Sequence, residues 1–385
     1  MRLLVVGHSY VTAFNQMKYA IMKRLHPALQ LKIISPRAAR DMYRRYEHEV
    51  APGLNAEEAV CLRDFFFKSH MTYLLDPIRF IKILMEFKPD YIHIEEDPHS
   101  LISFETVCLT SMCCPKTPIS FFIWDNLARV APFPLNALKR WLTFFALSRA
   151  ACVVAGNHEA QQLLGSRKNY HGPSFLLPQF GIDCAAYQGA PKPEIVQRVN
   201  KQPGVPVIGY MGRLISEKGI LLLCEALSGL EQTAWKLVIV GAGPLENILQ
   251  EHWKPKFGER LLLVGPGART DLPDYLKCMD VLVVPSVSTP VWKEQFGMVL
   301  IESMAAGVPV IGSTSGAIPE VIGEAGILVP EGDIQSLREA LARLLGSEQE
   351  RKRLSQLGQA RALGSFSHES VSNSYMNIFN QFSLN

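Results

Sequence analysis

The feature that most constrains the fold of this chain is a repeated alternation of short apolar runs with stretches of helical periodicity. Runs rich in Val, Ile and Leu are typical of strands buried on both faces, and the intervening stretches are long enough for crossover helices. The alternation therefore predicts parallel sheets covered by helices. The predicted strands are 3–7, 31–35, 91–95, 119–124, 151–156 and 174–178 in a first series, and 207–212, 236–241, 261–265, 281–286, 308–313 and 326–330 in a second.

Two strand series within 385 residues predict two domains, because one domain usually holds about 100–200 residues. Both are expected to be α/β domains with a doubly wound parallel sheet. The Pro-rich, charged segment 191–206 separates the two series and is typical of a linker. We expect an N-terminal domain over residues 1–198 and a C-terminal domain over residues 199–364. Residues 365–385 carry apolar side chains at helical spacing, which predicts a final helix with one buried face.

The net charge is only +3, but the charge is spread unevenly. The first fifty residues hold nine Lys or Arg residues against three Asp or Glu residues. Such a segment could contact anionic lipid head groups or an acidic acceptor, although a solvated helix and loop would explain the same composition. No recognised nucleic-acid-binding module accompanies the charge, so we expect no nucleic-acid partner. The cations are Lys18, Lys23, Arg24, Lys32, Arg37, Arg40, Arg44 and Arg45, together with Arg2.

Cysteine usage and hydropathy bear on the compartment. The eight cysteines show neither CxxC pairs nor spacing typical of metal ligands with histidine, so they are interpreted as reduced thiols. The first ten residues look like a strand and not a secretory signal, and no apolar run reaches 18 residues without a charge. We expect a cytoplasmic protein that attaches, if at all, peripherally to the inner face of a membrane.

Residues 294–302, EQFGMVLIE, are the most informative short motif. The helical spacing that follows predicts a helix beginning near Gly297, where the first backbone N–H groups and the positive end of the helix dipole form an anion site. A carboxylate in the preceding loop cannot neutralise the same anion, so Glu294 is interpreted as an acceptor for sugar hydroxyls. Glu302, about one turn into the helix, could reach a ribose. For this motif alone, a solvated helix start is the alternative.

Two cations follow the first strand of the second series. Arg213 and Lys218 lie at the carboxyl end of a predicted parallel strand, where open α/β sheets bind ligands, and a diphosphate needs such counter-charge. Surface cations near a turn are the alternative for this pair alone. The next strand ends in Gly241 and Gly243, but the third glycine of a dinucleotide fingerprint is replaced by Glu246. This argues against an NAD-dependent oxidoreductase.

Taken together, these residues resemble the retaining glycosyltransferases of family 4. The resemblance implies a GT-B fold, with two Rossmann-like domains facing a central cleft and a C-terminal helix that crosses back to the N-terminal domain. It also implies transfer of a hexose-type sugar from a nucleotide-sugar donor to a hydroxyl of a saccharide or lipid-linked acceptor, in cell-surface polysaccharide or glycolipid biosynthesis, without a metal or other cofactor. The matching segments are 209–219, 237–246, 261–267, 279–286, 294–311 and 316–322, with looser matches at 95–101, 121–127, 151–160 and 177–188.

The resemblance assigns roles position by position. Arg213 and Lys218 would bind the donor diphosphate, and Glu294 would hold hydroxyls of the donor sugar; these three form the expected catalytic set. Glu302 would hold the nucleotide ribose. The remaining donor-binding positions implied by the resemblance are Gly212, Gly241, Gly243, Val264, Gly265, Gly297, Met298 and Val299.

The acceptor half departs from the family pattern. Many relatives carry a histidine where this chain has Trp124, which could stack on a sugar ring or belong to the core. Asn126 could hydrogen-bond a sugar hydroxyl. Gly7 lies where the family has a Gly-rich loop, and Glu96, in an acidic cluster at a strand end, could orient acceptor hydroxyls, act as an acid or base, or bind a metal. A metal is disfavoured, because there is no DxD pair.

A catalytically silent nucleotide-sugar-binding module is the alternative to an enzyme. Such a module would be expected to lose Glu294, Arg213 or Lys218, and all three are present. The sequence therefore favours a transferase.

Overall fold

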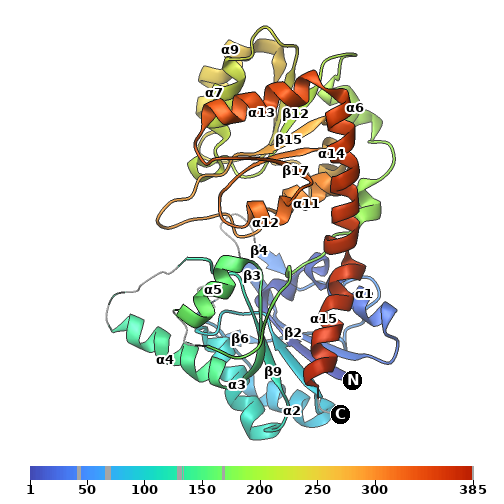
Figure 1. Ribbon diagram of the computed structural model, residues 1–385. Coiled ribbons are helices and arrows are strands. Elements are labelled where there is room, and N and C mark those ends of the chain that lie inside the picture. Colours follow the sequence, from blue (N-terminus) through green and yellow to red (C-terminus); the bar gives the residue numbers. More distant parts are fainter. Residues whose placement is uncertain (41–44, 66–70, 128–131, 133, 167–169, 384–385) are drawn as a thin grey trace. The chain divides into compact units, whose positions relative to one another are not determined.

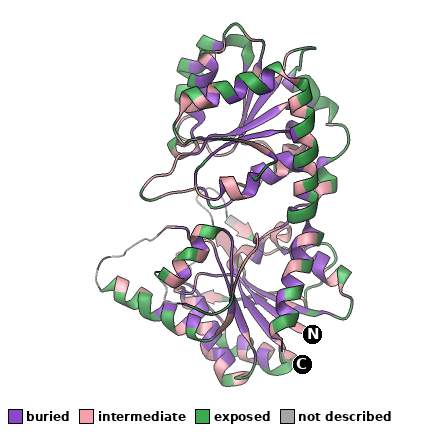
Figure 2. Cartoon of the chain, viewed as in Figure 1, coloured by how far each residue is buried: buried purple, intermediate pink, exposed green. Residues whose placement is uncertain are grey.

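The computed structural model describes residues 1–385 except 41–44, 66–70, 128–131, 133, 167–169 and 384–385. It contains two compact units, and the chain passes between them twice. The first unit comprises Met1–Gly181 and His368–Asn385, and the second comprises Ile182–Ser367. Within each unit, helices cover both faces of a parallel sheet (Figure 1). Figure 2 shows that buried residues concentrate on the strands of each sheet and on the helix faces turned toward it.

The N-terminal unit is built on a seven-stranded parallel sheet with the order β11-β10-β9-β8-β1-β2-β5. The chain builds β2 and β5 on one side of β1 and then places β8 on the other side, so the order reverses between β1 and β8. Ligands of open α/β sheets bind at the carboxyl ends of the strands beside such a reversal. The strands are β1 (Arg2–Val6), β2 (Gln30–Pro36), β5 (Ala59–Leu62), β8 (Tyr91–Ile94), β9 (Ile119–Ile123), β10 (Ala150–Ala155) and β11 (Ser174–Leu176), with two small antiparallel pairs, β3 (Ala38–Arg40) with β4 (Arg45–Glu47) and β6 (Asp64–Phe65) with β7 (Leu74–Leu75).

Alternate residues of these strands enter two different cores, because successive side chains of a strand point to opposite faces. Leu4 and Val6 pack with four helices on one face, whereas Leu3 and Val5 pack with two helices on the other. The four helices are α2 (Pro77–Phe87), α3 (Leu101–Cys113), α4 (Leu135–Ser148) and α5 (His158–Ser166); the two are α1 (Ala13–Leu25) and α15 (His368–Phe382).

The last helix, α15, belongs to the N-terminal unit although it ends the chain. Val371, Tyr375 and Phe379 are buried in the same core as Tyr19 and Met22 of α1. The prediction that a C-terminal helix returns to the N-terminal domain is confirmed.

The C-terminal unit is built on a six-stranded parallel sheet with the order β14-β13-β12-β15-β16-β17, which reverses between β12 and β15. Its strands are β12 (Val207–Met211), β13 (Lys236–Val240), β14 (Leu261–Gly265), β15 (Val281–Val284), β16 (Val310–Ser313) and β17 (Gly326–Val329). Its helices are α6 (Pro193–Val199), α7 (Ile220–Ser228), α8 (Glu246–Ile248), α9 (Lys254–Phe257), α10 (Leu272–Lys277), α11 (Met298–Ala305), α12 (Ile318–Ile322), α13 (Ile334–Gly346) and α14 (Glu348–Arg361).

All predicted strands form, with differences of one or two residues at their ends. The prediction missed β5, an edge strand of only four residues. The segment 191–206, predicted to be the linker, lies within the C-terminal unit, which begins at Ile182, and it contains α6, whose Ile195 and Val199 are buried. These two apolar residues, four positions apart, make one helix face that packs.

No helix among the described residues is both long enough and apolar enough to cross a membrane.

Candidate functional site

The predicted donor residues gather at the strand-order reversal of the C-terminal unit. The loop after β12 carries Arg213 and Lys218, and the loop after β15 carries Glu294. Because β12 and β15 are neighbours in a parallel sheet, both loops leave the same edge side by side.

Lys218 and Glu294 form an ion pair at the centre of this site. The distance from Lys218 Nζ to Glu294 Oε2 is 2.5 Å, and Ser286 Oγ donates to the same oxygen at 3.2 Å. The two charged side chains are only 19% and 8% exposed, respectively. Lys218 Nζ also lies 5.1 Å from the centre of the Trp292 ring, a cation–π distance. The site thus holds a fixed cation next to a fixed carboxylate, largely shielded from water.

Gly219 allows the two loops to approach each other. Its φ of +69° is in the left-handed region, and a Cβ at this position would lie 1.9 Å from the carbonyl oxygen of Pro285. Glu294 is held through its backbone, since its carbonyl accepts the N–H of Ala317 at 3.0 Å. The position of each charge is therefore set by backbone packing around it.

Arg213 lies in the same cluster, where it is half-buried. Its carbonyl accepts a hydrogen bond from the Tyr210 hydroxyl at 2.7 Å. Burial raises the pKa of Tyr210; the negative charge of Glu294 raises it further, and the positive charge of Arg213 opposes the increase. Arg213 and Glu294 therefore act on the same buried hydroxyl.

The helix predicted to begin near Gly297 is α11, which confirms that expectation. Gly297 is its N-cap with a φ of +80°, and Met298 and Val299 form its first turn. A Cβ on Gly297 would lie 3.7 Å from Cγ of Glu294, so the helix start is next to the Lys218–Glu294 pair.

Glu302 faces a different pair of residues. Burial raises its pKa, while the positive charge of Arg269 and a hydrogen bond donated by the Tyr187 hydroxyl oppose the increase. Tyr187 ends the short helix Cys184–Tyr187, and Arg269 follows β14. Sequence reasoning singled out Glu302 but missed both partners.

The remaining predicted donor positions line the carboxyl ends of β12, β13 and β14. Gly212 N–H donates to Val240 at 3.0 Å, and Gly241 N–H donates to Gly265 at 2.7 Å. A Cβ on Gly241 would lie 1.9 Å from the Gly212 carbonyl oxygen. In this structure, the missing Cβ of Gly241 therefore allows the neighbouring loop that contains Gly212 to come close.

Two further predicted positions have backbone contacts of the same kind. A Cβ on Gly243 would lie 2.5 Å from the Leu214 carbonyl oxygen, and the Val264 carbonyl accepts from Arg198 at 3.1 Å. Contacts of all these positions with a donor stay predictions.

Ser286 and Trp292 were also missed, although both lie in the segment between β15 and Glu294. A serine directly after an apolar strand and an aromatic residue beside a charged motif were the available signals. Neither signal distinguishes a binding residue from an ordinary turn residue.

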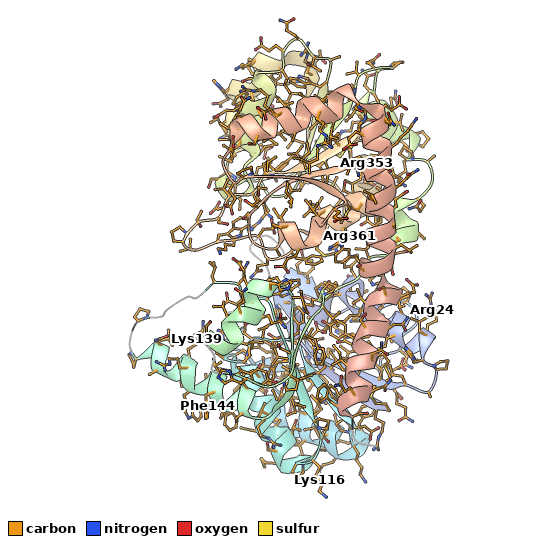
Figure 3. All side chains as sticks on the ribbon, in the orientation of Figure 1. Arg24, Lys116, Lys139, Phe144, Arg353 and Arg361 are labelled. Atoms are coloured by element: carbon orange, nitrogen blue, oxygen red, sulfur yellow. The ribbon has the colours of Figure 1, made fainter. Side chains whose placement is uncertain are left out.

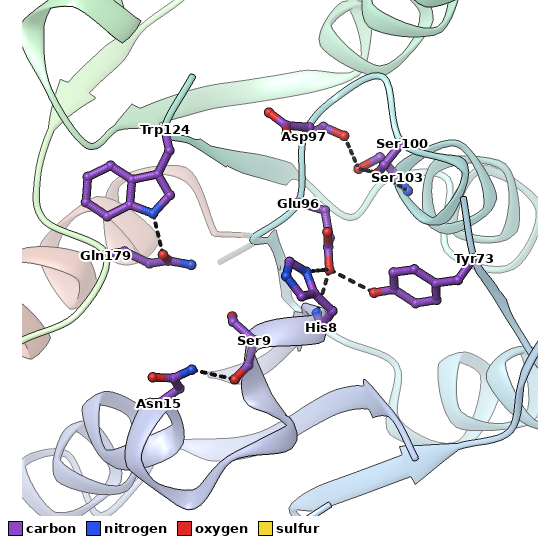
Figure 4. A network of polar contacts seen from close by, with 10 residues as sticks. All are labelled: His8, Ser9, Asn15, Tyr73, Glu96, Asp97, Ser100, Ser103, Trp124 and Gln179. Atoms are coloured by element: carbon purple, nitrogen blue, oxygen red, sulfur yellow. Dashed lines mark hydrogen bonds and ion pairs between the residues drawn. The ribbon is translucent and has the colours of Figure 1, made fainter. Parts of the chain in front are cut away.

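The N-terminal unit has a second polar cluster, at the reversal between β1 and β8. Glu96 Oε1 accepts the backbone N–H of His8 at 2.5 Å and the Tyr73 hydroxyl at 2.8 Å, and it lies 2.7 Å from Nδ1 of the His8 ring (Figure 4). Glu96 is only 4% exposed, while the His8 side chain is 32% exposed. Burial lowers the pKa of His8, but the charge and hydrogen bond of Glu96 outweigh it, so the pKa is raised. His8, which directly follows the candidate Gly7, was not predicted.

Glu95 points the opposite way from Glu96 and is not part of this cluster. Its Oε1 lies 2.7 Å from Lys18 Nζ and accepts the Tyr19 hydroxyl at 2.5 Å, and it lies 3.4 Å from Nε2 of His93. Lys18 is completely buried and its Nζ lies 4.0 Å from the Tyr375 ring centre. Lys18 therefore cannot belong to a basic surface, which corrects that part of the prediction.

The rest of the basic N-terminal region is partly neutralised. Lys23 pairs with Glu58 at 2.5 Å and Arg24 with Glu369 at 2.7 Å. Arg44 lies outside the described residues. Contact of this region with a membrane stays a prediction, with fewer available cations than its composition suggested.

Trp124 and Asn126 lie at the carboxyl end of β9. The Trp124 indole N–H donates to the Gln179 side-chain oxygen, and the Trp124 carbonyl accepts from the Asn157 amide at 3.3 Å. Figure 4 shows the Trp124–Gln179 pair and the Glu96 cluster in one view of this polar network. Asn126 is 5% exposed. Trp124 is half-buried, so it has both a packing role and an accessible part.

In comparisons with known proteins, a family model matches the C-terminal part of the chain by sequence, and solved structures match both units by fold. The family model described as "Glycosyl transferases group 1" matches residues 191–361. The putative teichuronic acid biosynthesis glycosyltransferase TuaC of Bacillus subtilis is 31% identical over 203 residues, covering 51% of this chain and 48% of that protein. The capsular polysaccharide biosynthesis glycosyltransferase CapM of Staphylococcus aureus is 29% identical over 180 residues, covering 46% of each chain. The chain thus spans about half the length of these curated relatives.

The fold comparison covers both units. The crystal structure of HepE from Anabaena in complex with UDP matches with a TM-score of 0.72 and 16% identity, over 99% of this chain and 100% of that chain. At this identity the match concerns the fold alone. The matched region, residues 191–361, holds Arg213, Lys218, Glu294 and α11 and belongs to the glycosyl transferases group 1 family, and the chain has the GT-B fold.

Proposed function

We propose that this protein is a retaining glycosyltransferase that moves a hexose-type sugar from a nucleotide-sugar donor to a hydroxyl of a saccharide or lipid-linked acceptor. The observation that carries the proposal is the shielded Lys218–Glu294 pair, 2.5 Å apart, beside the start of α11. A cation and a carboxylate held side by side suit a substrate that carries a diphosphate next to a sugar.

The donor is assigned to the C-terminal domain, residues 199–364. Breaking the bond between the anomeric carbon and the donor oxygen releases a negatively charged diphosphate and leaves an oxocarbenium-like sugar. Lys218, Arg213 and the first amides of α11 would stabilise the charge that develops on the diphosphate. Glu294 would accept hydrogen bonds from sugar hydroxyls, and Glu302 from the ribose. In this scheme, the departing phosphate accepts the proton of the acceptor hydroxyl on the same face of the sugar, so the anomeric configuration is retained.

The acceptor is assigned to the N-terminal domain, residues 1–198. His8 and Glu96 lie at the switch point of its sheet, and the exposed third of the His8 side chain could contact an acceptor hydroxyl. Glu96 would orient the imidazole, as a buried carboxylate does for many functional histidines. Trp124 and Asn126, at the next strand end, would contact the acceptor from the side.

The relatives suggest the product class. TuaC and CapM are named for teichuronic acid and capsular polysaccharide biosynthesis, and HepE has been crystallised with UDP and with UDP-glucose. We infer that this chain acts in cell-surface polysaccharide or glycolipid assembly, on the cytoplasmic side of the membrane.

Thermal-shift measurement against UDP-glucose, GDP-mannose and ADP-glucose tests the donor assignment. A donor that binds only the folded state stabilises it by about 2.7 kcal/mol at a hundredfold excess over Kd. The variant Lys218→Ala should lose that shift, and the control Lys352→Ala, which removes an exposed lysine of the same unit, should keep it. If no nucleotide sugar stabilises the protein, the assignment is wrong.

Turnover distinguishes an enzyme from a silent binding module. We expect release of nucleoside diphosphate from the selected donor, and the NMR coupling constant of the product's anomeric proton should show the donor's configuration. If the donor stabilises the protein but no tested acceptor gives turnover, the silent binding module is supported. A product with the inverted anomeric configuration would refute the retaining mechanism.

A further inference from the structure

The outward face of α4 is apolar. Leu135, Leu138, Trp141 and Phe144 are 58%, 52%, 52% and 60% exposed, although a helix on the surface of a water-soluble domain usually turns polar side chains outward. The opposite face is also apolar, and it is buried: Leu147 lies in the core under the sheet. The helix therefore has apolar side chains on both faces and uses only one of them for the fold.

The exposed rings are held in place. The Trp141 ring stacks on Phe145 with centroids 5.8 Å apart and an interplanar angle of 17°, and both rings contact Phe104 of α3, at 5.7 and 5.1 Å. Figure 3 shows Lys139 and Phe144 on this helix. The Trp141 ring is therefore positioned by its contacts with Phe104 and Phe145 while about half of its surface stays exposed.

The apolar surface extends onto the neighbouring helices. α3 lies beside α4, and α2 lies beside α3, on the same face of the sheet (Figure 1). Their largest exposed apolar side chains are Ile78, Met85 and Met112, which are 79%, 60% and 73% exposed.

The charge of the α4 surface indicates what kind of partner covers it. Residues 126–158 contain no Asp or Glu, and α4 carries Lys139 and Arg140, with Arg149 at its C-cap. A second copy of the chain would bring this cationic face against an identical one, and the charges would repel. An anionic lipid surface supplies both a medium for the apolar side chains and the opposite charge for the cations.

We propose that α4 is the membrane-docking surface of this protein, with Leu138, Trp141 and Phe144 inserted among the head groups of an anionic bilayer. Lys139 and Arg140 contact the lipid phosphates. This places peripheral attachment on α4, in contrast to the basic first fifty residues. The benefit of docking rests on the proposed function: docking would hold Trp124 and Asn126 close to a lipid-linked acceptor, because α4 follows the strand end that carries these two residues.

Trp141 is the reporter for the test. It is the most exposed of the five tryptophans, since Trp235 and Trp253 are buried and Trp124 and Trp292 are half-buried. On addition of vesicles of phosphatidylglycerol and phosphatidylcholine (3:7), tryptophan emission should shift to the blue and be quenched by brominated acyl chains. Phosphatidylcholine vesicles alone should produce a much smaller change. The variant Trp141→Ser should lose the signal.

Cosedimentation with the same vesicles measures affinity without relying on tryptophan. Leu138→Ser combined with Phe144→Ser should weaken binding at least about tenfold, because two half-exposed apolar side chains are no longer inserted. Ile248→Ser combined with Leu363→Ser removes side chains that are 41% and 63% exposed on the other unit, and it should leave binding unchanged. Lys139→Glu combined with Arg140→Glu should weaken binding to the anionic vesicles only.

Three outcomes would overturn the proposal: no vesicle binding by the full chain, equal loss in the control variant, or a dimer in light scattering that the α4 variant disrupts without any lipid effect. All measurements are made without donor. If the docking proposal is wrong, vesicle binding is lost but the thermal shift with nucleotide sugars remains. If the proposed function is wrong, that thermal shift is lost but vesicle binding remains.

Discussion

Breaking the Lys218–Glu294 pair is expected to destabilise the C-terminal unit measurably. At a separation of 2.5 Å and an effective dielectric constant of about 20, two unit charges attract with about 7 kcal/mol before desolvation is subtracted. Removing water from both groups offsets much of this attraction, since the side chains are only 19% and 8% exposed. We therefore expect a net coupling energy of about 1.5–3 kcal/mol between the two side chains.

A double-mutant cycle measures this coupling. The variants are Lys218→Met, Glu294→Gln and the double variant, and the free energy of opening is followed by hydrogen–deuterium exchange of peptides from β12 and β15, which reports this unit alone. Lys218→Met should be the more destabilising single change, because it leaves a carboxylate of low exposure without its counter-charge. The matched control is the exposed pair Lys352–Glu348 of α14, with the atoms 2.6 Å apart and side chains 73% and 70% exposed.

The control cycle should give no more than about 0.5 kcal/mol, since exposed helix pairs contribute little. A coupling energy for Lys218 and Glu294 no larger than that of the control would refute the reasoning, because shielding from water would then add nothing to the pair. The same variants should lower turnover about 10²–10³-fold if Lys218 stabilises the leaving diphosphate.

Three further predictions concern other positions. Gly219→Ala should lower the stability of its unit by at least about 2 kcal/mol and abolish donor binding, because a left-handed φ is unfavourable for a residue with a Cβ and a contact of 1.9 Å with a facing carbonyl is a clash; a thermal melt with and without donor checks this. Gly156→Ala would place a Cβ 2.2 Å from the Trp124 ring, so the ring must move, and near-ultraviolet circular dichroism should change while far-ultraviolet circular dichroism does not. The raised pKa of His8 means that its pairing with Glu96 stabilises the fold fully below about pH 6.5 and loses that contribution as pH rises through the raised value; a pH series of melting temperatures should show this decline, and Glu96→Gln should remove it.

Local sequence pattern was sufficient for most strands of the two parallel sheets and for the start of α11. A strand such as β15 is a continuous run of Val and Leu, and the start of α11 is marked by a glycine followed by apolar residues at helical spacing. Both signals depend on residues close together in the chain. The strand β5 was missed because a four-residue edge strand offers too short a pattern, and α6 was missed because Pro and charged residues mask two buried apolar positions.

The candidate site was only partly predictable for a related reason. The types of Arg213, Lys218 and Glu294 pointed to a donor site, but the ion pair joins two residues that are 76 positions apart in the sequence. His8 and Glu96 are 88 positions apart, and no local pattern indicates that β1 and β8 are neighbours. Glu95 and Glu96 look equivalent in the sequence, yet one is buried against Lys18 and the other holds His8.

The sequence by itself determined the two strand series, an amphipathic last helix and the start of α11, because these follow from hydropathy period and helix-start chemistry. The return of the last helix to the N-terminal domain was implied only by the family resemblance. Only the tertiary structure decided which charges meet, which lysine is buried and which face of α4 remains outside. In α4 both the exposed positions Trp141 and Phe144 and the buried positions Leu142 and Leu147 are apolar, so hydropathy alone does not identify which face packs on the sheet. The physical reason is the same in each case: packing between elements distant in the chain selects one partner or one face among several that the local sequence allows.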